Sequence, residues 1–262
     1  MFQRTVVSVG LLVLLFLTGC SIITGSGNVI TDERPVDGFD SIDLSTAGDL
    51  TIIQDERTSL VLKGEDNIIE RVETIVRGNR LIIRNRSRGI MTLFRNTRPI
   101  EIIVSTPTLE DVSVSGAGDI YAEALKTDKL EISISGAGDI QIDELESERI
   151  DVKISGAGDF DINELTTDVL ELEISGAGDI DLAGRANRAD FTVNGAGDIT
   201  ADDLRVDVAD IRVSGAGSVD AWVRETLDVR ISGIGGVNYY GNPQVEQSIS
   251  GMGDVESLGD KE

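Results

Sequence analysis

A five-residue segment recurs along most of this chain at nearly constant spacing. It reads SGAGD where it is best preserved, and successive copies begin 18 to 20 residues apart. The copies begin at Ser115, Ser135, Ser155, Ser175, Asn194, Ser214, Ser232 and Ser250, and an incomplete copy, TAGD, begins at Thr46. Repeats of this period are typical of solenoids, in which one structural unit stacks on the next. The chain is therefore expected to fold as a stack of similar coils.

Between the glycine corners, apolar and polar residues alternate with period two, as they do in a half-buried strand. In one copy, Leu130, Ile132 and Ile134 share a face, and polar residues separate them. The apolar positions recur in register from copy to copy. One column holds Ile134, Ile154, Ile174, Val193, Val213, Ile231 and Ile249, and another holds Ile140, Phe160, Ile180, Ile199, Val219, Val237 and Val255. Coils stacked about 4.8 Å apart would bury these columns in one continuous core.

We therefore predict an all-β protein, a parallel β-helix (β-solenoid) with coils of roughly 20 residues. Glycine at each corner is expected because the backbone has a positive φ there or because neighbouring coils approach closely. The regular repeats occupy residues 110–258, and residues 259–262 form a short tail. Residues 36–109 are predicted to be an irregular N-terminal part of the solenoid. Strands are expected there at 41–44, 50–54, 60–63, 72–77, 80–84 and 100–104, with a hairpin turn at 78–79 and one helical turn at 67–70.

Charge and composition exclude several classes of function. The chain carries 47 acidic and 23 basic residues, a net charge of −24, so it repels phosphate backbones and is not expected to bind nucleic acid. It contains no histidine, which excludes histidine triads and histidine metal sites. Its single cysteine excludes an intramolecular disulfide and multi-cysteine metal centres.

Residues 1–19 have the form of a bacterial signal peptide, which is removed before the protein folds. Arg4 precedes an apolar run of 12 residues, Val6 to Leu17. As a helix this run would span about 18 Å, too little for a bilayer core of about 30 Å. The tetrad Leu17-Thr18-Gly19-Cys20 resembles the lipobox, in which the cysteine thiol takes a diacylglycerol. The alternative is an ordinary secretory signal beside a chance cysteine.

We therefore expect an exported lipoprotein, held in the membrane by lipid on Cys20 and connected to the solenoid by a tether of residues 20–35. In an organism with two membranes, Ser21 after the lipidated cysteine is compatible with sorting to the outer membrane. Otherwise the anchor is expected on the outer face of the cytoplasmic membrane.

The chain resembles the bacterial GIN-domain family, which is described as the head of an auto-transporter adhesin. The resemblance lies in the VDGFDSIDLSTAGDLTI segment (36–52), the strand pair around 77–80, the TRPIEIIVSTPTLEDVSVSGAGD segment (97–119) and the repeats that follow. It covers residues 36–258, and it implies a right-handed β-helix in the cell envelope. It brings no catalytic residues. We expect the lipid on Cys20 to provide the anchor.

A column of carboxylates follows the glycine corners. Its members are Asp119, Asp139, Asp159, Asp179 and Asp198. Neighbouring carboxylates about 5 Å apart repel one another, and a Ca²⁺ ion between coils would compensate this repulsion. Aspartate after a glycine-rich corner also accepts local backbone N–H bonds, which explains the recurrence without metal. We favour the structural interpretation and keep Ca²⁺ as the weaker one.

A catalytic interpretation would pair outward acids such as Glu123 and Asp143, one coil apart, as in glycosidases. Acidic residues are spread over every outward face of the repeats, with no arginine or lysine focus among them, so we expect a solvated surface and no catalysis. Trp222 and Tyr240 occupy equivalent outward positions in successive coils. Two such rings can stack on sugars, or they can pack beneath a C-terminal loop.

The loop Arg84–Arg98 is the second break in the pattern. Residues 71–98 contain eight arginines and one acid, Glu73, and the loop also carries apolar side chains. Arg84, Arg86 and Arg88 could therefore contact anionic lipid or polymer. The alternative is a cap whose arginines pair with the acidic solenoid.

These features predict a non-enzymatic envelope lipoprotein that presents a rigid β-helical scaffold for adhesion or surface binding. Its expected partners are the membrane, through Cys20, and a cell-surface glycan or an envelope protein. The alternative is a carbohydrate-binding or polysaccharide-processing β-helix that uses outward acidic and aromatic residues.

Overall fold

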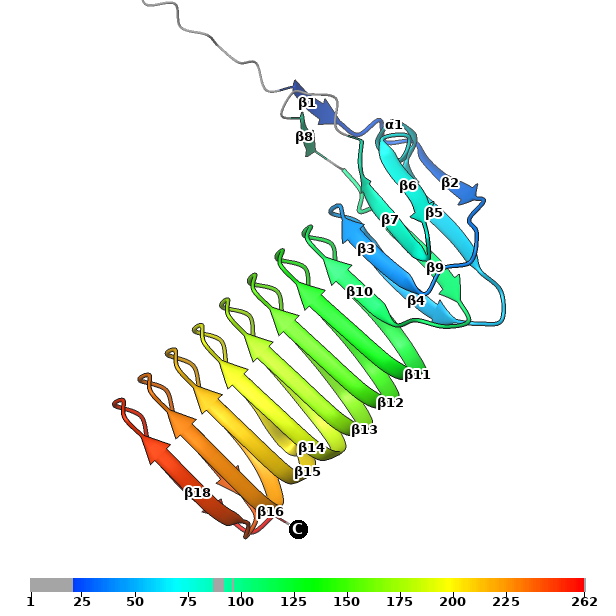
Figure 1. Ribbon diagram of the computed structural model, residues 1–262. Coiled ribbons are helices and arrows are strands. Elements are labelled where there is room, and N and C mark those ends of the chain that lie inside the picture. Colours follow the sequence, from blue (N-terminus) through cyan, green and yellow to red (C-terminus); the bar gives the residue numbers. More distant parts are fainter. Residues whose placement is uncertain (1–20, 87–91, 96, 262) are drawn as a thin grey trace, which may run out of the picture.

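The computed structural model describes residues 21–86, 92–95 and 97–261. The signal peptide, Cys20 and Arg88 lie outside these ranges. The described chain forms a long parallel β-solenoid, which confirms the predicted fold class (Figure 1). The regular coils are built from β10 (Asp111–Val114), β11 (Ile120–Ile134), β12 (Ile140–Ile154), β13 (Phe160–Ile174), β14 (Ile180–Val193), β15 (Ile199–Val213), β16 (Val219–Ile231), β17 (Val237–Tyr240), β18 (Gln244–Ile249) and β19 (Val255–Gly259).

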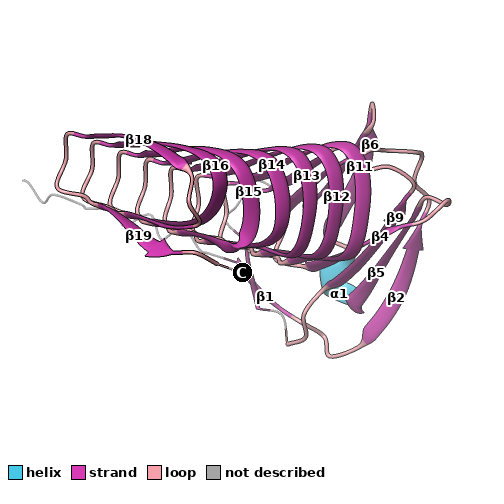
Figure 2. Cartoon of the chain, turned by 90° about the horizontal axis from the view of Figure 1, so that it is seen from below, coloured by secondary structure: helices cyan, strands magenta, loops and turns pink. Residues whose placement is uncertain are grey.

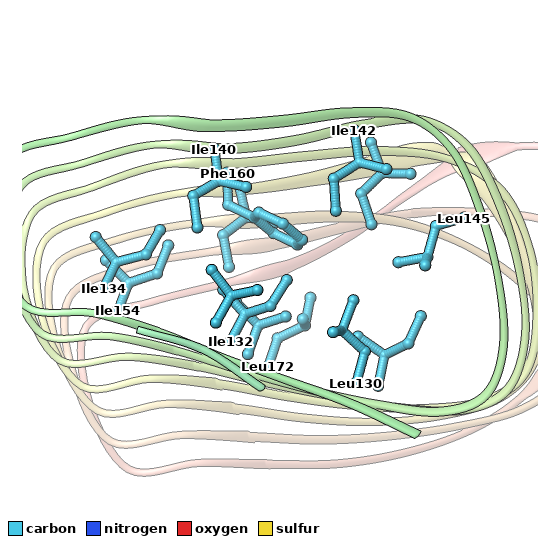
Figure 3. Packing of buried hydrophobic residues seen from close by; sticks show 14 of the residues in the cluster. Leu130, Ile132, Ile134, Ile140, Ile142, Leu145, Ile154, Phe160 and Leu172 are labelled. Carbon is cyan, nitrogen blue, oxygen red and sulfur yellow. The ribbon is translucent and has the colours of Figure 1, made fainter. Parts of the chain in front are cut away.

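Each regular coil consists of one long bent strand and one glycine corner. β12 pairs in parallel with β13 from Ile140↔Phe160 to Ile154↔Ile174, so equivalent residues of successive coils lie directly above one another. Figure 3 looks along this stack. Ile140 projects from one wall and Ile132 from the opposite wall into a shared apolar interior. Side chains of both predicted columns are buried in all but the last coil.

The corner glycines are required by the close approach of neighbouring coils. The glycines with positive φ in the described chain are Gly27, Gly78, Gly184, Gly241 and Gly259, none of which belongs to an SGAGD corner. A Cβ added at Gly158 would lie 2.1 Å from the carbonyl oxygen of Gly138 one coil away. The backbone N–H of Ala157 donates to the carbonyl of Gly136 at 3.0 Å, which holds the corners at this spacing. Of the two reasons expected for these glycines, the structure selects the steric one.

The N-terminal part contains the predicted strands and also antiparallel pairs. Its elements are β3 (Ser41–Ser45), β4 (Asp49–Gln54), β5 (Ser59–Glu65), α1 (Asp66–Ile69), β6 (Val72–Arg77), β7 (Arg80–Asn85) and β9 (Glu101–Thr106). β3 and β4 pair in parallel with β10 and β11, so the TAGD half-copy forms a true coil. β6 and β7 form the expected hairpin. Since β5 also runs antiparallel to β9, this part departs from a pure solenoid.

The expected tether is partly structured. Residues 29–34 form strand β2 (Val29–Arg34), which pairs antiparallel with β5 along its whole length. Arg34 fastens this strand, because its guanidinium donates to the carbonyls of Val72 and Ile69 at 2.6 and 2.8 Å. Closer to the N-terminus, β1 (Ser21–Thr24) pairs with β8 (Thr92–Arg95) in a separate two-stranded sheet.

The two ends of the solenoid differ (Figure 2). At the N-terminal end, Ile68 and Ile69 of α1 are buried, and together with β2, β5 and β6 they cover the core. At the other end, β18 and β19 form the last coil, in which Ile249 and Met252 are 42% and 84% exposed. Within the described ranges, no helix has the length and apolar character needed to cross a membrane.

Candidate binding sites

The aspartate column of the corners forms hydrogen bonds between coils. Oδ1 of Asp119 accepts the backbone N–H of Asp139 at 3.0 Å. The next three members continue the ladder, with N–O distances of 2.9, 2.8 and 2.8 Å as far as Asp198. The carboxylates therefore accept backbone N–H bonds, as the structural interpretation expected, but from the neighbouring coil; the prediction that these bonds are local to each turn was wrong. In the described part of the chain, no group of three or more acidic or cysteine side chains is arranged to hold a metal ion.

A second set of carboxylates lies on the outer face beside this column. Asp161 is the strand partner of Asp181 in the next coil, so two like charges stand directly opposite each other. Partial burial, followed by the charges of Asp181, Asp159 and Asp139, raises the pKa of Asp161. The same combination of burial and a neighbouring aspartate, Asp119, raises the pKa of Asp49. This face therefore concentrates unfavourable negative charge.

Asp143, one of the two acids considered for catalysis, belongs to a hydrogen-bonded network of surface side chains. Asp143 accepts hydrogen bonds from the Tyr121 hydroxyl at 2.5 Å, from Gln141 at 3.1 Å and from Asn163 at 2.8 Å. These bonds, that of Tyr121 first, lower the pKa of Asp143. A glycosidase general acid needs a raised pKa, so Asp143 is poorly suited to that role.

The opposite wall of the coils carries an ion-paired column that sequence reasoning missed. Its acids lie in strand register, and each has a basic partner within 4 Å. The column consists of Asp111, Glu131, Asp151, Glu171, Asp190, Asp210 and Asp228. Lys153, Arg188 and Arg212 border a shallow hollow of about 460 Å³ on this face. The expectation of acids without a basic focus therefore fails on this wall. Some pairs join residues two apart in one strand, such as Lys153–Asp151, and others, such as Arg149–Glu171, join neighbouring coils.

Trp222 and Tyr240 are strand partners in β16 and β17, as their positions in the repeat predicted. Their surroundings come from a change in coil length. Between β15 and β16 the register jumps from Ala201↔Ala221 to Arg205↔Trp222, so three residues of β15, 202–204, bulge opposite Trp222. Because the coil of β16 is shorter here than that of β15, Asp202 and Asp203 of the bulge lie beside the aromatic pair.

The C-terminal tail covers these rings. Gly259, whose φ is +89°, is the last residue of β19 and is the strand partner of Tyr240. Lys261 then places its ammonium 5.9 Å from the ring centre of Trp222 and 5.0 Å from that of Tyr240. The same ammonium donates to the carbonyl oxygen of Asp202 at 2.5 Å and to carboxylate oxygens of Asp202 and Asp203 at 3.1 and 2.8 Å. Packing beneath a C-terminal segment is therefore the arrangement the structure contains.

One side of Trp222 borders a small open hollow of about 240 Å³. Polar side chains that line it include Glu164, Arg185 and Arg205. The hollow is smaller than the pockets of about 300–1,000 Å³ that enclose drug-sized ligands, and its dimensions suit a single small ring or group.

The arginine loop is described only in part. Arg84 pairs with Glu73 of the adjacent strand at 2.9 Å, so one of the three candidate arginines is engaged within its own hairpin. Arg86 is exposed, and its backbone N–H donates to Arg71 at 2.7 Å. Arg88 lies outside the described residues. β8, at the end of the loop, is hydrogen-bonded to β1, which begins one residue after Cys20.

Comparison with solved structures supports the architecture. A protein described as a putative lipid binding protein from Parabacteroides distasonis has 24% identity and a TM-score of 0.87, over 91% of this chain and 100% of that one. A putative adhesin from Parabacteroides merdae has 27% identity and a TM-score of 0.84, with the same coverage. A putative adhesin from Bacteroides fragilis has 28% identity and a TM-score of 0.68, over 90% of this chain and 100% of that one. No curated protein matches the chain.

A family model matches two overlapping regions of the chain, residues 38–163 and 131–243. Together the two matches cover the N-terminal strands and the regular coils through Tyr240. The chain belongs to the family described as "Putative auto-transporter adhesin, head GIN domain".

Proposed function

We propose that this protein is a non-catalytic envelope lipoprotein that uses its solenoid as a rigid spacer for adhesion. The observation that carries the proposal is the separation of the two ends. β1, next to the lipidation residue Cys20, lies at one end of the solenoid, and the last coils lie at the other (Figure 1). A lipid on Cys20 would hold the first end at the membrane and direct β16–β19 outward. Membership of an adhesin-head family supports this role.

The arginine loop fits the membrane-proximal end. Because β8 pairs with β1, the loop is held close to the proposed lipid anchor. Basic side chains near an anionic leaflet contribute about 1 kcal/mol each. Arg86 is exposed and available for such a contact. The two acyl chains of a diacylglycerol already give a stable anchor, so the role of a basic segment beside it is to orient the attachment.

The far end offers the second contact, and carbohydrate is the alternative ligand there. The hollow beside Trp222 combines an indole with Glu164, Arg185 and Arg205, which can hydrogen-bond to sugar hydroxyls. This observation favours binding of a single sugar unit beside Trp222, in a hollow lined by β13 to β16, over processing of a polysaccharide along the acidic face.

The anchor is tested by fractionation of cells that express the Cys20→Ala variant. We expect loss of lipid labelling and release of a soluble or unprocessed protein. Unchanged partitioning into detergent would refute the anchor.

The contacts are tested by pull-down of anionic liposomes and by a glycan array, with a hydrolysis assay on any glycan bound. The Arg84/Arg86/Arg88→Ser variant should lose liposome binding, and the native binding should weaken steeply from low to physiological salt. The Trp222→Ala/Tyr240→Ala variant should lose glycan binding, which should depend little on salt. Retention of both activities in both variants would place the contacts elsewhere, and turnover of a bound glycan would overturn the non-catalytic role.

A further inference from the structure

The ammonium of Lys261 occupies a complete cation-binding cage. Two aromatic rings lie within 6 Å of it, at the distance where an ammonium interacts favourably with a π face. Three oxygen acceptors, the Asp202 carbonyl and the carboxylates of Asp202 and Asp203, lie within 3.1 Å. An ammonium has three N–H donors, so the number of acceptors equals the number of donors.

The cage is built by the solenoid and not by the tail that fills it. Trp222 and Tyr240 are fixed by strand pairing between β16 and β17. Asp202 and Asp203 are fixed by the bulge of β15. Lys261, in contrast, lies outside these strands, two residues after β19 ends at Gly259. Removal of Lys261 therefore leaves the four walls in place.

We infer that this cage is a binding site for primary ammonium groups of external ligands, and that Lys261 is a tethered competitor that closes it. The ligand class follows from the acceptors. A primary ammonium can donate to all three oxygens while its alkyl chain lies along the rings. A quaternary ammonium retains the attraction to the rings but donates no hydrogen bond. Amino sugars, lysine side chains and ethanolamine headgroups all carry the required group.

Charge also favours this class of ligand. The side chain of Lys261 remains 25% exposed within the cage, so one side is open for exchange. Burial opposes its protonation, but the hydrogen bonds of Asp203 and Asp202 outweigh burial and raise the pKa of Lys261. The site thus stabilises a positive charge against partial desolvation.

The fluorescence of Trp222 provides the test, because it is the only tryptophan in the chain. The purified mature protein and its Lys261→Ala variant are titrated with n-butylammonium, an analogue of the lysine side chain. Tetramethylammonium, 1-butanol and NaCl of matched ionic strength serve as comparison solutes. The variant should show a saturable change in Trp222 emission, and the native protein should bind at least about tenfold more weakly because Lys261 competes.

Tetramethylammonium should bind the variant at least about tenfold more weakly than n-butylammonium, the factor expected for lost charge-assisted hydrogen bonds. Adding Asp203→Asn to Lys261→Ala should weaken amine binding by a similar factor. A variant that keeps the native circular dichroism spectrum but shows no saturable response would overturn the inference, as would equal binding of the two cations. If Lys261→Ala disrupts the last coil, Lys261→Gln, which preserves most of the side-chain length, replaces it.

This inference rests on the proposed binding role for its biological use. The two can fail separately, because the titration needs neither cells nor an anchor. Amine binding without adhesion would refute the role and leave the site, whereas adhesion without amine binding would refute only the site.

Discussion

Replacement of a single corner glycine tests the physical basis of the coil spacing. Gly158 lies at the centre of the stack, and its backbone is not in the left-handed region. A methyl group at this position would be 2.1 Å from the carbonyl oxygen of Gly138. The two coils would have to separate by about 0.9 Å to restore even a 3.0 Å contact. Gly158→Ala is therefore expected to be destabilising even though alanine can adopt the backbone conformation.

The magnitude follows from overpacking and from the hydrogen bonds that the separation stretches. Overpacking in a well-packed interior costs about 1–3 kcal/mol. The Ala157 N–H to Gly136 O bond and the Asp159 N–H to Asp139 Oδ1 bond, at 3.0 and 2.9 Å, flank the inserted methyl. A lost hydrogen bond contributes about 0.5–1.5 kcal/mol. The free energy of unfolding should fall by about 2–6 kcal/mol, which corresponds to a melting temperature lower by roughly 4–24 °C.

Thermal unfolding followed by circular dichroism, together with a urea titration, measures the effect. Gly38→Ala is the matched control, because an added Cβ there meets nothing within 4 Å and φ is not positive. This control should be neutral or more stable by about 0.4–1 kcal/mol, since alanine reduces the entropy of the unfolded chain. Equal melting temperatures for the two variants would refute the steric explanation of the corners.

Three further predictions concern the core, the acidic face and the aspartate ladder. Ile154→Asp should lower the free energy of unfolding by several kcal/mol, because it buries an unpaired polar group. Lys153→Asp, at the outward neighbour, should lower it much less. Equal losses in urea titrations would contradict the alternation of inward and outward residues. Asp161→Asn should raise the free energy of unfolding at neutral pH by about 0.2–1 kcal/mol by removing a like-charge pair. The pKa of Asp161 is raised in the folded state, so its carboxylate destabilises the fold fully above that pKa and not at all below the pKa of the unfolded chain. The stability gained in Asp161→Asn should therefore disappear at low pH. A gain that persists at low pH would exclude like-charge repulsion as the cause. Millimolar Ca²⁺ should shift melting only as far as screening does; saturable binding that survives NaCl and is lost in Asp139→Asn/Asp159→Asn would establish a metal site.

The repeat made the core predictable. Because a strand alternates sides at every residue, the spacing of Ile134, Ile154 and Ile174 was sufficient to place them on the inner wall and above one another. The strands of the N-terminal part, its hairpin at 78–79 and its helical turn were also predicted from local patterns, but the other strand pairs were not. β2 was missed because its partners leave no local signal in the sequence. The strand pairs with β5, and its Arg34 donates to the carbonyl of Val72; these partners lie about 30 to 40 residues away.

The candidate site was predicted only in its aromatic half. Trp222 and Tyr240 could be paired because both occupy one position of the repeat. The contribution of Asp202 and Asp203 depends on a register shift between β15 and β16, and that of Lys261 follows an irregular end of β19 at Gly259. Neither has a periodic signature, because both arise where the period changes.

The sequence by itself determined the stacked coils, the buried columns and the glycine corners, because these follow from the period of the repeat and the alternation of a strand. Only the tertiary structure decided why glycine is needed at the corners and which charges meet. Stacking brings residues about 20 positions apart to within hydrogen-bond distance. On one wall of the coils it adds the ion pairs Arg149–Glu171 and Arg230–Asp210, and on the other wall it places Asp161 opposite Asp181. The ammonium cage likewise exists only when the three coils of β15, β16 and β17 are stacked, because its four side chains come from different coils and meet only in space.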